Sequence, residues 1–171
     1  DFDLAALADF CESLRVPFAT GKADIAGVIR ETANKEPCFT CAFFRRGAVN
    51  RFAETNGFNK VALAHHHDDA VETFLMSLLY SGKLQTFLPC TYLDRTGLTE
   101  IRPLVYFRER EIAQAIHYHG FKPIPSPCPF NGKTKRQEIK EFIVSLGNNV
   151  PQVYDRLAAA MRRSDSSELW P

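Results

Sequence analysis

Apolar residues recur at helical spacing in several parts of the chain. The clearest case is the segment DDAVETFLMSLLY, in which the apolar positions 71, 74, 75, 78 and 79 follow one another at i, i+3, i+4, i+7 and i+8. This spacing places the five side chains on one face and predicts an amphipathic helix. Similar but weaker patterns predict further helices at about residues 4–11, 24–34, 43–55, 108–119, 134–146 and 151–163.

Short apolar runs between these segments predict strands. KVALA at 60–64 is compact, as expected of a buried strand, and VPFAT at 16–20 is interpreted in the same way. Farther along, the turn residues at 94–97 separate two apolar runs, which predicts a hairpin or strand pair. Because helices and strands alternate, we expect an α/β fold with a parallel sheet flanked by helices. We predict one domain over residues 1–163 and a tail at 164–171.

The composition is that of an ordinary globular protein. Apolar residues make up 45% of the chain, and the formal net charge of +1 gives no general reason to expect a polyanionic partner. No apolar run is long enough to span a membrane, so we expect no membrane partner. The five cysteines are odd in number and unevenly spaced, which argues against a disulfide-built scaffold and favours the cytoplasm.

A run of histidine and aspartate follows the strand predicted at 60–64. Three histidines precede Asp68 and Asp69, and one of these aspartates is expected to cap the following helix. Glu72 and Thr73 follow Asp69 at i+3 and i+4, so their polar groups share the first turns. Ligands of open α/β sheets bind beyond the carboxyl ends of the strands, which predicts a ligand site here. Taken separately, Asp68 and Glu72 have a simpler interpretation as a cap and a charged first turn.

Cys38 and Cys41 form a Cys-x-x-Cys pair whose role depends on other ligands. The sequence has no second pair of this kind, so a four-cysteine zinc site is not supported, while a redox dithiol stays open. Cys128 lies in the proline-bounded segment SPCPF, an unusual place for a buried thiol. The three thiols match an iron–sulfur cluster with one open iron or, with a histidine added, a zinc site. Cys11 and Cys90 are expected to be small buried residues.

The segment AHHHDDAVETFL resembles the His-His-x-Asp-Asp-x-x-Glu-Thr signature of the PP-loop ATP pyrophosphatase superfamily. Together with CFTCAFFRRG, YSGKL, IRPLVYFRE and SPCPFNGKTKRQEIKEF, in that order, it makes roughly residues 1–160 similar to the tRNA 2-thiocytidine synthetase group. The resemblance implies a Rossmann-like fold of the adenine nucleotide alpha hydrolase type. It also implies an enzyme that uses ATP and Mg²⁺ to adenylate a tRNA base and then inserts sulfur from a donor.

The resemblance further implies roles for individual residues. Asp68, Asp69, Glu72 and Thr73 would be catalytic, His65 and His66 would bind the nucleotide cofactor, and Cys38, Cys41 and Cys128 would hold a [4Fe–4S] cluster.

Two basic clusters flank the cysteines and are expected to contact phosphates of the tRNA backbone. The residues concerned are Arg45, Arg46, Lys133, Lys135 and Arg136.

The phosphate-binding loop of this superfamily, Ser-Gly-Gly-x-Asp-Ser, has no counterpart in the sequence. Such a loop needs clustered glycines so that backbone N–H groups can approach phosphate. The nine glycines here are scattered, and no two are closer than Gly21 and Gly27. We therefore expect the loop and an N-terminal strand to be missing from this chain. We also expect that it does not hydrolyse ATP alone, and that the sheet edge left exposed pairs with a second copy.

Two other functions stay open at this stage. HHHDDAVETFL also resembles tRNA(Ile)-lysidine synthetase, a ligase that needs no set of three thiols. A zinc-stabilised RNA-binding module without catalysis would use the same cysteines and a histidine for structure. The identity of the metal separates this module from the thiolating enzyme.

Overall fold

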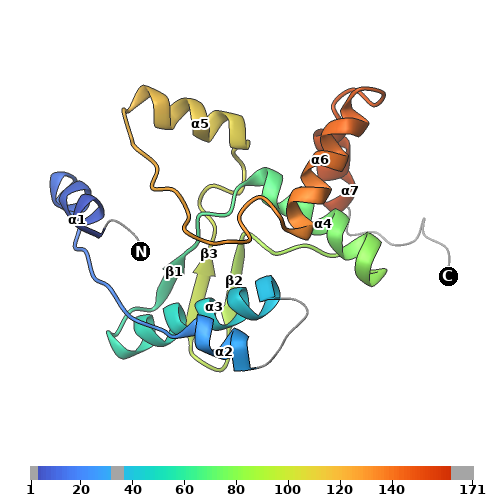
Figure 1. Ribbon diagram of the computed structural model, residues 1–171. Coiled ribbons are helices and arrows are strands. Elements are labelled where there is room, and N and C mark those ends of the chain that lie inside the picture. The colour runs from blue at the N-terminus through green and yellow to red at the C-terminus, as the bar shows by residue number, and fades with distance from the viewer. Residues whose placement is uncertain (1–3, 32–36, 163–171) are drawn as a thin grey trace.

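The computed structural model describes residues 4–31 and 37–162, so the tail predicted at 164–171 lies outside the described residues. Figure 1 shows a small sheet with helices arranged around it. The elements, in order, are α1 (Leu4–Ser13), α2 (Ile25–Glu31), α3 (Pro37–Thr55), β1 (Lys60–Ala62), α4 (His67–Ser81), β2 (Cys90–Leu93), β3 (Leu98–Ile101), α5 (Glu109–Tyr118), α6 (Lys135–Gly147) and α7 (Val153–Arg162).

The sheet has three strands in the order β1-β3-β2. β1 runs parallel to β3, with Lys60 paired to Thr99, whereas β2 runs antiparallel to β3. The predicted α/β fold is confirmed, but the purely parallel sheet is wrong, because β2 and β3 form the hairpin expected around 94–97. A short turn can join only antiparallel neighbours, and Gly97, at φ 67°, supplies the left-handed residue of this turn.

The helix α3 covers the sheet through Ala53, which packs with Val61 of β1 and Leu98 of β3. It begins at Pro37, earlier than the apolar pattern predicted, and proline is well suited to a first helical position because it lacks an N–H group. The early start places Cys38 in the first turn of the helix. Gly57, at φ 73°, follows the helix as expected of a terminating glycine.

The strand predicted at 16–20 is wrong, since these residues are irregular and exposed. Strands are stabilised by hydrogen bonds to a neighbouring strand. Within the described residues, the only strand pairs are those of β1, β2 and β3.

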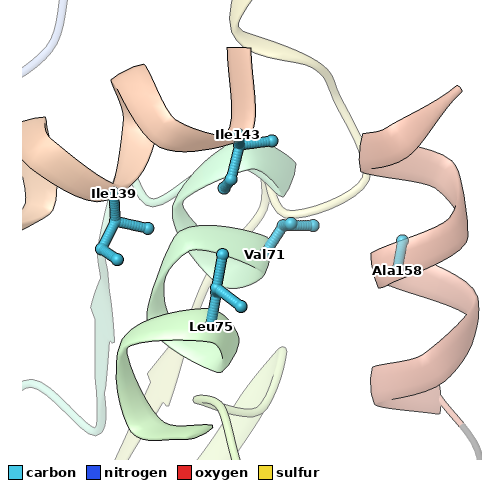
Figure 2. Close-up of a cluster of buried hydrophobic side chains, with 5 residues drawn as sticks. All are labelled: Val71, Leu75, Ile139, Ile143 and Ala158. Atoms are coloured by element: carbon cyan, nitrogen blue, oxygen red, sulfur yellow. The ribbon is translucent and has the colours of Figure 1, made fainter. Parts of the chain in front are cut away.

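A second core lies where α4, α6 and α7 pack together. Figure 2 shows its buried side chains, which come from all three helices: Val71, Leu75, Ile139, Ile143 and Ala158. The apolar stripe predicted on α4 is buried in its first half, whereas Leu78 and Leu79 are exposed. This core fixes α4 and α6 side by side.

The helices α1 and α5 stand away from the two cores (Figure 1). Phe10 of α1 meets Phe121 edge to face, with ring centroids 5.1 Å apart. None of the helices in the described ranges has the length and apolar character needed to cross a membrane.

Candidate functional site

The histidine run leads from β1 directly into the first turn of α4. His66 is the N-cap: its Nδ1 accepts a hydrogen bond from the Asp69 backbone N–H at 3.4 Å, and the Asp69 carboxylate accepts one from the His66 N–H at 3.0 Å. The expectation that Asp68 or Asp69 would be the cap residue is therefore wrong. The N-cap lies at least two residues earlier than predicted, because an imidazole nitrogen serves as the acceptor that a capping aspartate usually provides.

Asp68 is buried and forms an ion pair with Arg108. Its side chain is only 6% exposed, and Arg108 Nε donates to its two oxygens at 3.0 and 3.2 Å. The backbone N–H of Glu109 adds a third bond at 2.7 Å. Burial alone would raise the pKa of Asp68, but these donors outweigh it and hold the pKa below its ordinary value. The Arg108 guanidinium also lies 4.5 Å from the ring centroid of Tyr154. Asp68 is thus ionised and tied to the start of α5.

A second cluster joins α4 to the start of α6. Arg136 donates to Glu72 Oε2 at 3.2 Å, to Thr73 Oγ1 at 2.9 Å and to the Asp69 backbone oxygen at 3.1 Å. Its Nη1 also lies 3.5 Å from the Asp69 carboxylate. The prediction that Asp69, Glu72 and Thr73 share one face is confirmed, since one guanidinium reaches all three. Arg136, which was expected to contact RNA, is engaged within the protein.

Glu72 is buried in this cluster, with an exposed fraction of 3%. Burial raises its pKa, while the hydrogen bond from Arg136 opposes that rise. The carboxylate therefore depends on Arg136 as its counter-ion.

Three arginines, Arg102, Arg136 and Arg45, act electrostatically on His65. The ring lies 5.0 Å from that of Phe87, and its Nδ1 is buried without a partner among the described residues. Burial lowers the pKa of His65, and Arg102, Arg136 and Arg45 lower it further against the opposing effect of Asp69. Because Arg45 belongs to α3, this helix lies within electrostatic reach of the histidine run.

The three candidate cluster thiols come from two distant segments. Cys38 and Cys128 are exposed and Cys41 is partly buried. Partial burial raises the pKa of Cys38, and the Cys128 and Cys41 thiols raise it further, so Cys38 lies within electrostatic reach of both. Across 4–31 and 37–162, however, no three His, Cys, Asp or Glu side chains are arranged as a ready metal site. The donor set fits a metal cluster, because a bound cation would relieve the repulsion between neighbouring thiolates.

The other two cysteines differ from expectation. Cys11 is partly buried, and Cys90, which was expected in the core, is exposed at the start of β2. The two inward residues of the hairpin are instead Leu98 and Glu100 of β3.

Four of the five basic candidates are exposed and lie close in the sequence to the candidate cluster thiols. Arg45 and Arg46 are exposed on α3, as is Lys133 before α6. Lys135 is exposed and pairs with Glu138 at 2.8 Å. These four side chains are more accessible to a partner than Arg136.

Sequence reasoning missed two ion pairs that each involve a buried carboxylate. Arg102 bonds Glu100 at 3.2 Å, and both are almost fully buried. Opposite charges two positions apart share one face of a strand, a signal that could have revealed this pair. The pairing of Arg108 with Asp68 spans forty positions and has no comparable local signal.

A hollow of about 920 Å³ lies elsewhere, between α2 and α3. Its lining is mostly apolar and includes Phe43, Phe44 and Phe52. The histidines and carboxylates described above do not line it, so the candidate site stays with them.

The chain matches the model of a known protein family. The family model described as a PP-loop domain matches residues 1–145. Since the match begins at residue 1, it gives no support to the expected absence of an N-terminal portion.

The curated relatives include two bacterial enzymes with the same name. The tRNA-cytidine(32) 2-sulfurtransferase of Coxiella burnetii (strain RSA 493 / Nine Mile phase I) is 32% identical over 171 residues, covering 98% of this chain and 67% of its own length. The enzyme of that name from Shewanella loihica is 32% identical over 165 residues, covering 95% of this chain and 52% of its own length. The chain thus spans between about half and two thirds of these relatives.

Among solved structures, the U34-tRNA thiolase NcsA from Methanococcus maripaludis, with its [4Fe-4S] cluster, is similar in fold. The TM-score is 0.74 at 22% identity, over 94% of this chain and 56% of the thiolase chain. This likeness confirms an α/β fold like that of the thiolase.

Proposed function

The chain belongs to the PP-loop domain family, and on that premise we propose that it serves in an ATP-dependent tRNA thiolase. The observation that carries the proposal is that the Cys128 thiol raises the pKa of Cys38, as the Cys41 thiol does, although Cys128 lies in a distant segment of the sequence. The sulfurtransferase relatives and the fold of the thiolase support the same reaction class.

Cys38, Cys41 and Cys128 would hold a [4Fe–4S] cluster. Cys38 lies in the first turn of α3, where the unpaired N–H groups of a helix favour negatively charged ligands. When bound, the cluster would supply an open iron at which the sulfur to be transferred is held. The exposure of Cys38 and Cys128 leaves this position accessible to a substrate.

The residues at the start of α4 would serve the nucleotide half of the reaction. The carboxylates of Asp69 and Glu72 and the Thr73 hydroxyl offer the oxygen ligands that Mg²⁺ prefers. His65 and His66 would border ATP. The oxygen of the base attacks the α-phosphorus, pyrophosphate leaves, and sulfur then displaces AMP from the activated base. The resemblance implies a catalytic role for Asp68. In this proposal Asp68 would act indirectly, by holding the start of α5 in place through Arg108 and the Glu109 N–H.

The tRNA backbone would lie across the exposed basic side chains near the thiols. Arg45, Arg46, Lys133 and Lys135 are placed to neutralise phosphates, and contacts of this kind orient a nucleic acid without reading its sequence. A separate sulfur donor would reload the enzyme.

Metal analysis tests this proposal. We would reconstitute the protein with iron and sulfide without oxygen and measure iron, sulfide and zinc per chain, with Cys128→Ser as the variant and Cys90→Ser as its control. We expect about four irons and four sulfides in the wild type and the control, and loss of both in Cys128→Ser. One tightly held zinc without sulfide would instead identify the RNA-binding module.

We further propose that this 171-residue chain alone releases no pyrophosphate from ATP, because its sequence contains no Ser-Gly-Gly-x-Asp-Ser segment. A pyrophosphate assay with tRNA present tests this point independently of the metal. Sustained release would show that other residues of the chain bind the phosphates.

A further inference from the structure

Arg136 lies where two parts of the candidate site meet. It is in the first turn of α6, and its guanidinium donates to three oxygens in the first two turns of α4. Glu72, one of these acceptors, is buried. Charge-assisted hydrogen bonds in a partly desolvated place are strong and depend on geometry.

The apolar contact between the two helices does not by itself define how they are aligned. Ile139 and Ile143 pack on Val71 and Leu75 (Figure 2). Hydrophobic contact is non-directional, so it tolerates small shifts of one helix along another. The hydrogen bonds of Arg136 are directional and select one alignment for the start of α6.

The start of α6 is linked to Cys128 by consecutive turns. The Cys128 backbone oxygen accepts from Asn131 N–H at 3.0 Å, and the Phe130 oxygen accepts from Lys133 N–H at 3.0 Å. Thr134 then caps α6 by accepting from the Gln137 N–H at 3.2 Å. A shift of the first turn of α6 would therefore be carried back to Cys128.

We propose that Arg136 is a positioning residue that sets the position of Cys128 relative to Cys38 by locking the start of α6 to the first two turns of α4. It thereby couples the thiol region to the carboxylates of Asp69 and Glu72. Its role in cluster assembly rests on the proposed function, whereas its placement of the thiol does not.

A cross-linking rate tests the placement without any metal. In a background with Cys11, Cys41 and Cys90 replaced by serine, only Cys38 and Cys128 can react. Dibromobimane becomes strongly fluorescent when both of its arms have reacted with thiols. We would measure the rate of the second, intramolecular step in this background and in the same background with Arg136→Gln, Arg136→Lys or Arg156→Gln. The last variant is the control, because it changes an exposed arginine of α7.

We expect the intramolecular step to slow about tenfold in Arg136→Gln, since such steps depend steeply on how the groups are held. Arg136→Lys keeps a counter-ion for Glu72, so it should fold, but one ammonium cannot satisfy the same set of acceptors and the step should also slow. The control should match the background. The first, single-thiol reaction of each variant should stay unchanged, which separates misplacement from altered reactivity. Equal intramolecular rates in folded Arg136→Lys and in the control would overturn the proposal.

Reconstitution of the same two arginine variants, with all five cysteines present, tests the coupling to the cluster. If the wild type binds a cluster, Arg136→Lys should bind several-fold less iron and sulfide under limiting iron. A wild type that binds none would refute the proposed function, while the cross-linking result would still decide the role of Arg136.

Discussion

At the scale of single residues, the pairing of Asp68 with Arg108 illustrates how burial decides the role of a carboxylate. Asp68 accepts three hydrogen bonds, and its partner is itself held over the Tyr154 ring. A carboxylate closed in this way has little access to a substrate. Its negative charge instead fixes Arg108 and the adjoining N-terminus of α5.

Arg108→Gln should lower the free energy of unfolding by about 3 kcal/mol, because it leaves a buried charge without its partner. Urea denaturation at neutral pH measures the change. Arg110→Gln, an exposed arginine of the same helix, is the control. A loss no larger than in the control would show that the pair contributes little.

The loss of unfolding free energy in acid should depend on Asp68. Because its folded pKa lies below 3.8, the stability it contributes is complete above that pH and is lost as the pH falls through the folded pKa. The gap in unfolding free energy between the wild type and Asp68→Asn should therefore narrow in strong acid.

Glu72 should behave with the opposite sign. Its folded pKa lies above 4.5, so its ionisation in the folded state costs stability as the pH rises through that pKa. As the pH rises from 4.5 through the folded pKa, the wild type should lose unfolding free energy relative to Glu72→Gln. Thermal unfolding at a series of pH values follows this loss. Parallel curves would contradict the raised pKa.

At the scale of elements, the apolar core between α4, α6 and α7 holds together the helices that carry the candidate site. Ile143 is fully buried in this core, whereas its neighbour Val144 is exposed. Ile143→Ala should cost about 3 kcal/mol of unfolding free energy through lost burial and a cavity. Val144→Ala should change it by less than about 0.5 kcal/mol. Chemical denaturation of both variants checks the difference, and equal losses would place Ile143 outside the core.

The same elements show what the sequence could predict. The apolar period of α4 was recognisable because it is local, and so was the β2–β3 turn with Gly97. The strand expected at 16–20 failed, since an apolar run does not reveal whether a neighbouring strand is available. The cap at His66 was missed because histidine is not among the usual capping residues.

At the scale of the whole molecule, local motifs supplied the candidate site residues but not the contacts that join them. The shared face of Asp69, Glu72 and Thr73 follows from helical spacing. The contacts of Arg136 with that face cross more than sixty positions, so no spacing rule indicates them. The sequence therefore predicted an RNA contact for this side chain but not its hydrogen bonds to α4.

The free edge of β1 concerns the assembly of the whole chain. In the described sheet, β1 pairs only with β3, which leaves one row of its backbone groups for another partner. We predict that the chain forms a dimer through this edge. Sedimentation equilibrium over a dilution series measures the mass, and a monomer at every concentration would contradict the prediction.

The ion pairs join residues that are far apart in the sequence, which has a consequence for folding during synthesis. Asp68 leaves the ribosome forty residues before Arg108, and Glu72 leaves it sixty-four residues before Arg136. At about 5–20 residues per second, these carboxylates spend seconds without the cations that permit their burial. They must stay hydrated during that time, so α4 cannot dock until α6 has been synthesised. The candidate site therefore cannot assemble before α6 has been synthesised.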